Sequence, residues 1–319
     1  MAERGLVTGV GSRSVRVFVD GIGTLRCTLR GTLWPEAEAA GLTRPVAVGD
    51  RVELEIEGDE GAVCAVEPRR NRLSRQAATG HAAGGRGRDR DRQYGGPPPV
   101  QVIAANLDRI LVVASLNDPP FRPGLVDRFL VAAAAEEIDA TLVLNKVDLP
   151  GEPEVVQPWR DAGVHVICTS TETGEGIDEL APLLRDGICL LVGHSGVGKS
   201  SLLNAVDPTL KLDTGEVTLH HGRGRHTTTH VSLLPLEGGG WVVDSPGIRA
   251  FGLEDVPLEV LARLFPGFGD LPHDCKFRDC LHREEPGCAV IAAAENGTLD
   301  EDRFETYERI RDDLAAGEG

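Results

Sequence analysis

The sequence lacks a long hydrophobic run and the residue pattern of a secretory signal peptide. Its longest uninterrupted apolar run, residues 129–135, has seven residues, whereas a helix that spans a bilayer needs about 20. The N-terminus does not show the basic stretch followed by an apolar one that marks a signal peptide. These absences argue against a membrane-spanning or secreted protein, so we expect a soluble, cytoplasmic protein without a membrane partner.

Lysine is also scarce, because only four of the 33 basic residues are lysines and the rest are arginines. Two of the four, Lys146 and Lys199, lie in the two candidate nucleotide motifs described below. A compact ammonium group suits such sites, where a planar guanidinium would not fit. This placement argues against chance matches to the motifs.

The formal net charge of −17 argues weakly against a nucleic-acid partner. The charge is unevenly spread, however, since residues 69–92 hold eight arginines and two aspartates, a local balance of +6. Salt screens charges more than about 10 Å away, so this stripe can still bind phosphates.

Length and composition indicate several domains and a linker. At about 150 residues per domain, 319 residues suggest two or three domains. In residues 1–70 we expect short strands at 14–19, 24–29, 51–56 and 62–66, which predict a small β-barrel, either OB-like or SH3-like. Residues 71–100 predict a basic, flexible linker, because a Gly/Arg/Pro-rich segment cannot bury a core.

The second half alternates predicted strands and helices. Within residues 101–252 we expect strands at 109–115, 140–144, 164–168, 188–192 and 241–244, with helices at 125–137, 177–184 and from 200. This alternation predicts an α/β domain with a mainly parallel sheet. Residues 253–319 hold a Cys/His cluster and a predicted helix at 301–315.

A phosphate-binding loop follows the predicted strand 188–192. The pattern G-x-x-x-x-G-K-[ST] predicts a loop whose backbone N–H groups surround phosphates, with Lys199 on the β- and γ-phosphates and Ser200 on Mg²⁺. The residues are Gly193, His194, Ser195, Gly196, Val197, Gly198, Lys199 and Ser200.

A guanine-binding motif ends the predicted strand 140–144. Asn145, Lys146, Val147 and Asp148 match N-K-x-D, in which Asp148 accepts hydrogen bonds from the guanine N1–H and amino group. Ser170, after the next strand, suits a second loop that contacts the base. Motifs at the carboxyl ends of parallel strands meet at one edge of the sheet, where ligands bind.

Two further segments predict contacts to Mg²⁺ and to the attacking water. Asp244 and Gly247 match D-x-x-G, and Ile248 stands where Ras-like proteins place a water-orienting Gln. We expect Thr228, in His226-Thr227-Thr228-Thr229, to bind Mg²⁺. His226 or His230 is a candidate to assist water attack, beside the alternative of an exposed loop histidine.

Three of the seven cysteines cluster with a histidine. Cys275, Cys280, His282 and Cys288 supply three thiolates and an imidazole within 14 residues. A complete four-ligand set predicts a structural rather than a catalytic zinc ion.

The order of these motifs is the most specific feature of the chain. N-K-x-D precedes the phosphate loop, which reverses the Ras-like order and indicates a circularly permuted G domain. With H-T-T-T, D-S-P-G and the Cys-Cys-His-Cys cluster following, the chain closely resembles the ribosome small-subunit-dependent GTPase A family over about residues 105–290.

The resemblance implies a GTP hydrolase that acts late in maturation of the 30S ribosomal subunit and binds its 16S rRNA. It adds Ser201 to the phosphate contacts and implies one zinc ion and Mg²⁺ with GTP. Thr171 departs from the family's usual Ser-Ala at 170–171, and the long arginine-rich linker puts its rRNA contacts in doubt. Hydrolysis is expected to be slow alone and stimulated by the small subunit, and we expect a monomer. The alternatives are a non-ribosomal GTP-dependent switch with a nucleic-acid- or protein-binding barrel and, more weakly, a metabolic P-loop kinase.

Overall fold

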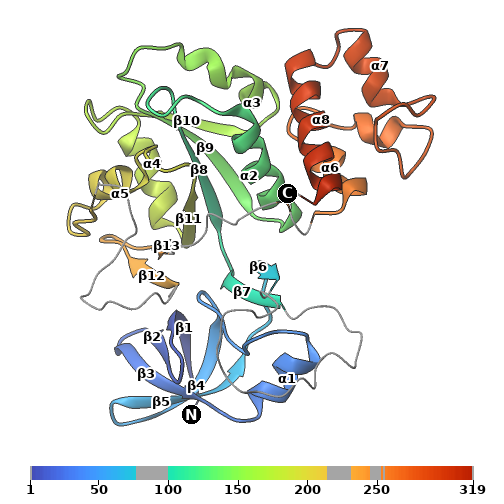
Figure 1. The fold of residues 1–319 in the computed structure, drawn as a ribbon. Helices are drawn as coiled ribbons and strands as arrows, with labels where there is room; N and C mark the ends of the chain where they lie inside the picture. Colours follow the sequence, from blue (N-terminus) through green and yellow to red (C-terminus); the bar gives the residue numbers. More distant parts are fainter. Residues whose placement is uncertain (1, 77–99, 214–230, 245–252, 254–255, 318–319) are drawn as a thin grey trace, which may run out of the picture. The chain divides into compact units, whose positions relative to one another are not determined.

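The computed structural model describes residues 2–76, 100–213, 231–244, 253 and 256–317. The chain divides into two compact units, Met1–Asn106 with His230–Leu233, and Leu107–Thr229 with Leu234–Gly319 (Figure 1). Among the described helices, none is both long enough and apolar enough to cross a membrane.

The first unit contains a closed five-stranded barrel. Its strands are β1 (Glu3–Val10), β2 (Val15–Val19), β3 (Gly23–Leu29), β4 (Arg51–Glu57) and β5 (Glu60–Val66). They pair in the order β1-β2-β3-β5-β4, and β1 pairs with β4 to close the barrel. Helix α1 (Leu33–Ala39) lies between β3 and β4 in the chain. Five strands closed in this way form an OB-like barrel, as the sequence predicts.

The barrel core is built mainly from inward-facing residues at alternate positions along the strands, which explains why four of the strands are recognisable from sequence. Strand β1 was not expected, because polar and glycine residues interrupt its alternation. The core residues are Val7, Val15, Val17, Val19, Cys27, Leu33, Val46, Val52, Leu54 and Val63.

Two additional strands, β6 (Arg72–Gln76) and β7 (Val100–Ala105), pair antiparallel in the first unit. The described ends of the predicted linker are therefore strands, and residues 77–99 lie outside the described part of the chain. The contact pattern groups residues 100–106 with the barrel. The four-part division expected from the sequence remains a prediction.

The second unit contains a parallel sheet in the order β10-β9-β8-β11-β13. Each neighbouring pair in this order is parallel. The strands are β8 (Arg109–Ser115), β9 (Asp139–Asn145), β10 (His165–Thr169), β11 (Ile188–Val192) and β13 (Trp241–Asp244), with β12 (Ser232–Pro235) preceding β13. Both the α/β class and the positions of these five parallel strands agree with the sequence-based expectation.

Helices connect the strands of this sheet. They are α2 (Pro123–Ala135), η2 (Pro153–Val156), α3 (Gln157–Asp161), α4 (Ile177–Arg185) and α5 (Lys199–Val206). Apolar residues of α4 and α5 pack with Leu111 and Val143 of the sheet in one core. The short elements η2 and α3 escape prediction because four or five residues show no helical periodicity.

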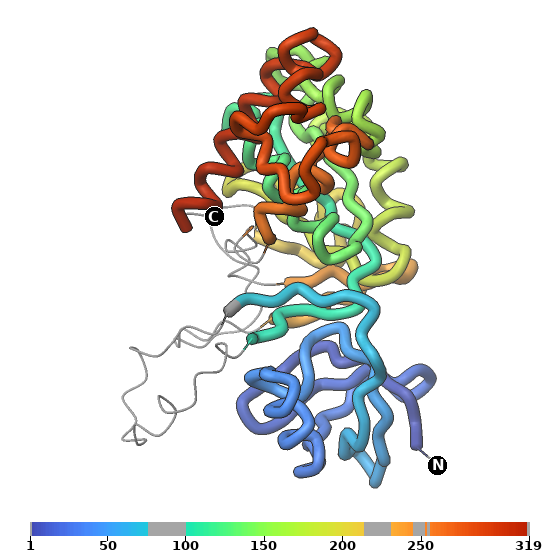
Figure 2. The backbone as a smooth tube through the Cα atoms, turned by 90° about the vertical axis from the view of Figure 1, so that its right-hand side faces the viewer, coloured from blue at the N-terminus to red at the C-terminus, as the bar shows by residue number. Residues whose placement is uncertain are grey.

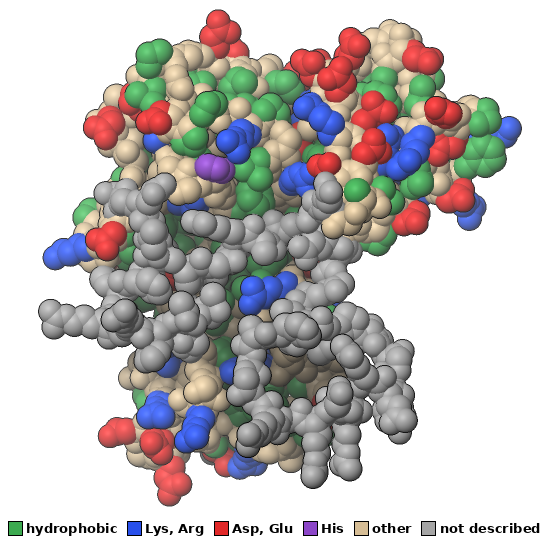
Figure 3. Space-filling model, viewed as in Figure 1, with side chains coloured by type: hydrophobic (Ala, Val, Ile, Leu, Met, Phe, Trp, Pro, Cys, Tyr) green, Lys and Arg blue, Asp and Glu red, His purple; other side chains and the backbone are tan. Residues whose placement is uncertain are grey.

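The C-terminal region forms α6 (Leu258–Leu264), η4 (Leu271–Asp274), α7 (Ala289–Glu295) and α8 (Glu301–Ala316). Both α6 and α8 contact α2, and the two views show them beside it (Figures 1 and 2). Acidic side chains are frequent over this region in the space-filling view (Figure 3). Packing against α2 makes the C-terminal region part of the second compact unit.

Candidate functional site

The sheet topology brings the predicted nucleotide motifs to one edge. Gly193 follows β11, Lys146 follows β9 and Ser170 follows β10, while Asp244 ends β13. These strands are parallel neighbours around β8, so their carboxyl ends lie together, as in other open α/β sheets that bind ligands there.

The phosphate loop requires glycine at two positions. Gly193 has φ 143°, and a side chain there would overlap the carbonyl oxygen of Val113. Gly198 has φ 96°, and its Cβ would overlap the side-chain amide of Asn145. Only glycine fits a backbone that passes so close to its neighbours. Helix α5 begins directly after the loop at Lys199, so its positive end faces the loop.

The side chain of Lys199 folds back over this loop. Its Nζ donates to the carbonyl oxygens of Gly193 and His194 at 2.8 and 2.9 Å. The Lys199 ammonium group therefore lies beside the exposed loop residues His194, Ser195 and Gly196. This arrangement concentrates positive charge and N–H donors where an anion is expected to bind.

Asn145 holds the base and phosphate motifs together. Its side chain is 1% exposed, and its Nδ2 donates to the Val197 carbonyl at 2.8 Å. Its Oδ1 accepts from Thr169 Oγ1 at 3.0 Å. The buried amide thus ties β9, β10 and the phosphate loop together, which gives Asn145 a positioning role.

Asp148 is fixed by Ser170. The Ser170 hydroxyl donates to Asp148 Oδ1 at 2.6 Å and accepts from the backbone N–H groups of Glu172 and Thr173, both at 3.2 Å. Ser170 is fully buried, whereas Asp148 is exposed. A rigid serine therefore orients a solvent-accessible carboxylate, which is the arrangement needed to accept two N–H groups of a base.

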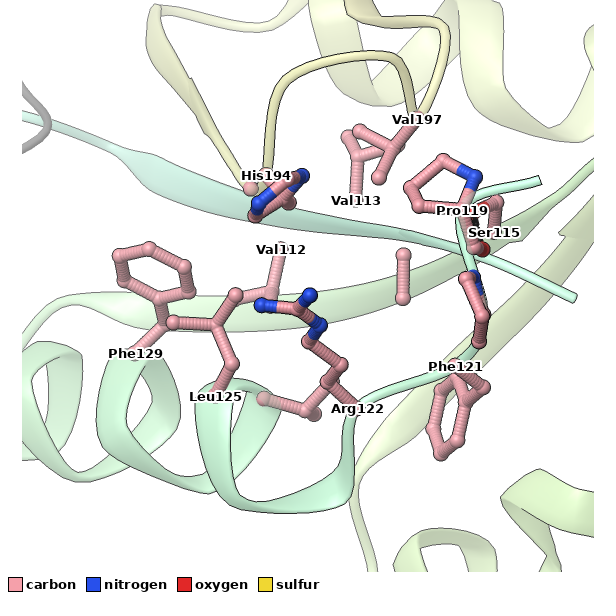
Figure 4. A pocket seen from close by; sticks show the side chains of 14 residues that line it. Val112, Val113, Ser115, Pro119, Phe121, Arg122, Leu125, Phe129, His194 and Val197 are labelled. Carbon is pink, nitrogen blue, oxygen red and sulfur yellow. Dashed lines mark hydrogen bonds between the residues drawn. The ribbon is translucent and has the colours of Figure 1, made fainter. Parts of the chain in front are cut away.

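Lys146 connects the base motif to the segment 117–122. It has a φ of 62°, and its Nζ donates to the Asp118 carbonyl. The same segment lines an apolar pocket with the phosphate loop and the start of α2 (Figure 4). In Figure 4, His194 and Val197 face Arg122 and Leu125 across this pocket.

Asp244 is 8% exposed at the end of β13. It lies beside β11, the strand that leads into the phosphate loop, and its contact to Mg²⁺ remains a prediction. The predicted residues His226, Thr228, His230, Gly247 and Ile248 lie outside the described residues, so their roles remain predictions.

The four predicted metal ligands converge in the C-terminal region. The ligand atoms of Cys275, Cys280, His282 and Cys288 all lie within 4.8 Å of one another. With Zn–S near 2.3 Å and Zn–N near 2.0 Å, a tetrahedral site places two sulfurs about 3.8 Å apart and sulfur and nitrogen about 3.5 Å apart. The distance from Cys275 Sγ to Cys288 Sγ is 3.8 Å, and that to His282 Nδ1 is 3.6 Å. The donor set therefore fits a tetrahedral metal site.

The surroundings of this cluster keep two of its cysteines and its histidine uncharged when no cation is bound. Burial raises the pKa of the Cys280 thiol to about 12 and also raises that of Cys288. Burial lowers the pKa of His282, which keeps its imidazole neutral and able to bind a metal. Since buried thiolates are unfavourable alone, a bound cation is what would stabilise them.

Backbone contacts hold the ligand loop in shape. Arg311 of α8 donates to the His282 carbonyl at 2.8 Å. The carboxylate of Glu285 accepts from the backbone N–H groups of Leu281 and Arg283 at 2.8 and 2.7 Å. These contacts come from residues outside the four predicted ligands and hold the loop that carries them, as such contacts do in known metal sites.

Sequence reasoning missed two groups of residues that shape the site. Thr169 anchors Asn145, but a threonine at the end of a strand carries no distinctive signal. Asp127 and Arg303 form an ion pair between α2 and α8 although they are 176 residues apart. Neither residue belongs to a motif, so only the tertiary structure could bring them together.

Comparison with known proteins agrees with this geometry. The RsgA GTPase family model matches residues 66–254. The small ribosomal subunit biogenesis GTPase RsgA of Chlorobaculum parvum is 39% identical over 318 residues, covering 97% of each chain. The protein of the same name from Chlorobaculum tepidum is 40% identical over 321 residues, covering 98% of each.

Two solved structures share the fold over almost the whole chain. YjeQ from Thermotoga maritima has a TM-score of 0.74 at 32% identity, covering 99% of both chains. YloQ, described as a circularly permuted GTPase, has a TM-score of 0.72 at 28% identity, covering 99% of this chain and 96% of its own. The permuted order expected from the motifs is therefore that of a known fold.

Proposed function

This chain belongs to the RsgA GTPase family, and from that premise we propose that its GTP hydrolysis serves a late step in maturation of the small ribosomal subunit. The observation that supports the GTP-binding part of the proposal most strongly is the joining of the base motif and the phosphate loop through Asn145. The matching names of the Chlorobaculum relatives support the ribosomal role. The chain's partners are then GTP or GDP and the 30S subunit with its 16S rRNA, in the cytoplasm.

We propose that the site divides between base and phosphates. Asp148, held by Ser170, accepts from the guanine N–H groups, while Asn145, Lys146 and Val147 shape the base pocket. Lys199 and the backbone of residues 193–201 bind the phosphates. Ser200 and Thr228 would bind Mg²⁺ and Asp244 would hold it through water, where the ion would supply positive charge beside the β- and γ-phosphates.

The cysteine cluster is proposed to hold one structural zinc ion. All four ligands come from the protein, so no position is left open for a substrate or an activated water. The ion would fix the loop between η4 and α7, which has few apolar residues of its own. His226 remains the proposed assistant of water attack, in place of the Gln that Ile248 replaces.

GTP hydrolysis with and without purified 30S subunits tests this function. A partner that supplies or rearranges catalytic groups raises GTPase rates by about 10³–10⁵-fold in other systems. We expect slow turnover of the protein alone and a large increase on addition of 30S subunits but not of 50S subunits. Equal rates under all three conditions would contradict the ribosomal role.

A further inference from the structure

A buried ion pair joins the C-terminal region to helix α2. Arg303 Nη1 on α8 donates to Asp127 Oδ2 on α2 at 2.7 Å, and the two side chains are 7% and 0% exposed. Trp159 on α3 donates from Nε1 to the other Asp127 oxygen at 2.8 Å. Arg303 Nη2 donates to the Pro266 carbonyl at 2.6 Å. Three segments of the second unit therefore meet at one carboxylate.

Aromatic rings complete the contact of Arg303. Its guanidinium carbon lies 4.9 Å from the Trp159 ring centroid and 4.8 Å from that of Phe265. A planar guanidinium can stack on aromatic rings and form directed hydrogen bonds at the same time, which a lysine ammonium group cannot do. Within the described part of the chain, Arg303 Nε has no hydrogen-bond partner. A buried charge with one unsatisfied donor contributes less stability than an apolar contact would, but its directed bonds to Asp127 and Pro266 restrict how α8 packs on α2.

The same cluster continues to the nucleotide motifs. Phe121 meets the Trp159 ring edge-on, with the centroids 5.4 Å apart. Phe121 belongs to the segment 117–122, whose Asp118 carbonyl accepts from Lys146 of the base motif. Pro119 and Phe121 of this segment also line the pocket that His194 of the phosphate loop shares (Figure 4). A set of contacts thus runs from the base motif to α8, and the phosphate loop shares a pocket with the segment 117–122 on this route.

We propose that Asp127, Trp159 and Arg303 couple nucleotide binding to the docking of the C-terminal metal-cluster region, with Arg303 as a positioning residue. Bound nucleotide holds Lys146 and the phosphate loop in place, and these in turn hold the segment 117–122. Phe121 of this segment then positions the Trp159 ring, which stacks on Arg303. Coupling between two binding or docking events is reciprocal. Tighter docking of α8 therefore strengthens nucleotide binding, and nucleotide strengthens docking. The inference depends on guanine nucleotide binding but not on the ribosomal role.

The decisive variant is Arg303→Met in the full-length, zinc-loaded protein. Its affinities for a fluorescent GDP and a non-hydrolysable GTP analogue should fall by about fivefold or more, the lower range of allosteric coupling. Nucleotide should slow amide hydrogen exchange in residues 301–316 of the wild type and not of the variant. Arg303→Lys should behave like Arg303→Met, because lysine cannot replace the stacked fork.

Arg128→Ala is the matched control. Arg128 pairs with Asp313 across the same two helices, but the two side chains are 23% and 46% exposed. A partly exposed pair of this kind contributes less than a buried one, so nucleotide affinity and exchange should stay within twofold of the wild type. Equal losses in Arg128→Ala and Arg303→Met would indicate general loosening of α8 and overturn the proposal.

Phe121→Leu keeps the proposal testable if Arg303→Met fails to fold. Phe121 lies on the nucleotide side, away from the metal cluster, so zinc content should be unchanged. The variant should lose the nucleotide-dependent slowing of exchange in α8. Retention of that slowing in a folded variant, or nucleotide affinity within twofold of the wild type in folded Arg303→Met, would refute the coupling. Failure of the wild type to bind guanine nucleotide would instead refute the proposed function.

Discussion

At the scale of single residues, the base site consists of an accessible acceptor on a buried support. Asp148 is exposed to solvent, whereas Ser170 and Asn145 are almost fully buried. The serine hydroxyl donates to the carboxylate and accepts from two backbone N–H groups. The Ser170 hydroxyl thus makes every hydrogen bond that it can. Changes at Asp148 should therefore alter which base is preferred, whereas changes at Ser170 should alter how tightly the base is bound.

Asp148→Asn should change the base preference rather than abolish binding. The asparagine amide would place an N–H donor against the amino group of guanine, which is also a donor. Xanthine has a carbonyl oxygen at that position, which can accept from the amide. A site with defined hydrogen bonds rejects the wrong partner by roughly 10⁴-fold, so preference should move from GTP to xanthosine triphosphate. Competition of both nucleotides against fluorescent GDP measures the change, and identical GTP affinity in variant and wild type would exclude Asp148 as the base acceptor.

Ser170→Ala should weaken guanine binding without changing the preferred base. Hydrogen bonds to charged groups contribute about 1.5–3 kcal/mol, and each 1.4 kcal/mol corresponds to a tenfold change in affinity. A loss of about tenfold or more is therefore expected for GDP, with xanthosine diphosphate no better bound. Thr173→Ala is a suitable control, because only the Thr173 backbone contacts Ser170. A Ser170→Ala protein with wild-type affinity would show that Asp148 needs no support.

At the scale of elements, the ends of strands and helices carry the chemistry. The phosphate loop lies between β11 and α5, and the other end of α5 is closed by Asp207. The Asp207 carboxylate accepts from the backbone N–H of Glu237 at 2.8 Å and from the hydroxyl of Thr209 at 2.6 Å. One buried carboxylate therefore ties the phosphate-loop helix to the turn between β12 and β13.

Asp207→Asn should lower the free energy of unfolding by about 1–3 kcal/mol at pH 7, because a charged acceptor of several bonds is lost. Burial raises the pKa of Asp207, but bonds from Glu237 and Thr209 and the charge of Arg185 together hold it below the usual value. The contribution is therefore present above the ordinary pKa of 3.8 and lost as pH falls through the lower folded pKa. Urea unfolding of both proteins from pH 7 to pH 3 should show the difference shrinking below about pH 4. A constant difference across this range would contradict the assignment.

At the scale of the whole molecule, the C-terminal region is packed on the G domain rather than attached only by the chain. In the sequence, residues 253–319 with the Cys/His cluster follow soon after the D-x-x-G motif at 244–247. Buried contacts between α2 and α8 also join this region to the rest of the second unit. Nucleotide state should therefore reach the metal-cluster region through packed side chains as well as through the connecting segment.

Cys280→Ser should remove most of the bound zinc, because three ligands hold the ion less well than four. The wild type is expected to contain about one zinc per chain by metal analysis, and the variant substantially less. We also expect weaker binding to 30S subunits and, through Arg303, a several-fold loss of nucleotide affinity. Cys64→Ser, in strand β5, supplies the control for loss of a thiol outside the cluster. Wild-type protein purified under reducing conditions without zinc would contradict the structural metal.

The sequence by itself determined the parallel strands β8–β11 and β13, the phosphate loop, the base motif and the four clustered ligands. These features are encoded locally, because hydrophobic runs, glycine spacing and ligand spacing act over short stretches of chain. Only the tertiary structure showed how Thr169 anchors Asn145 and how Asp127, Trp159 and Arg303 meet. Such contacts depend on which helix faces which, and a single buried arginine 176 residues from its partner leaves no periodic or spaced pattern in the sequence.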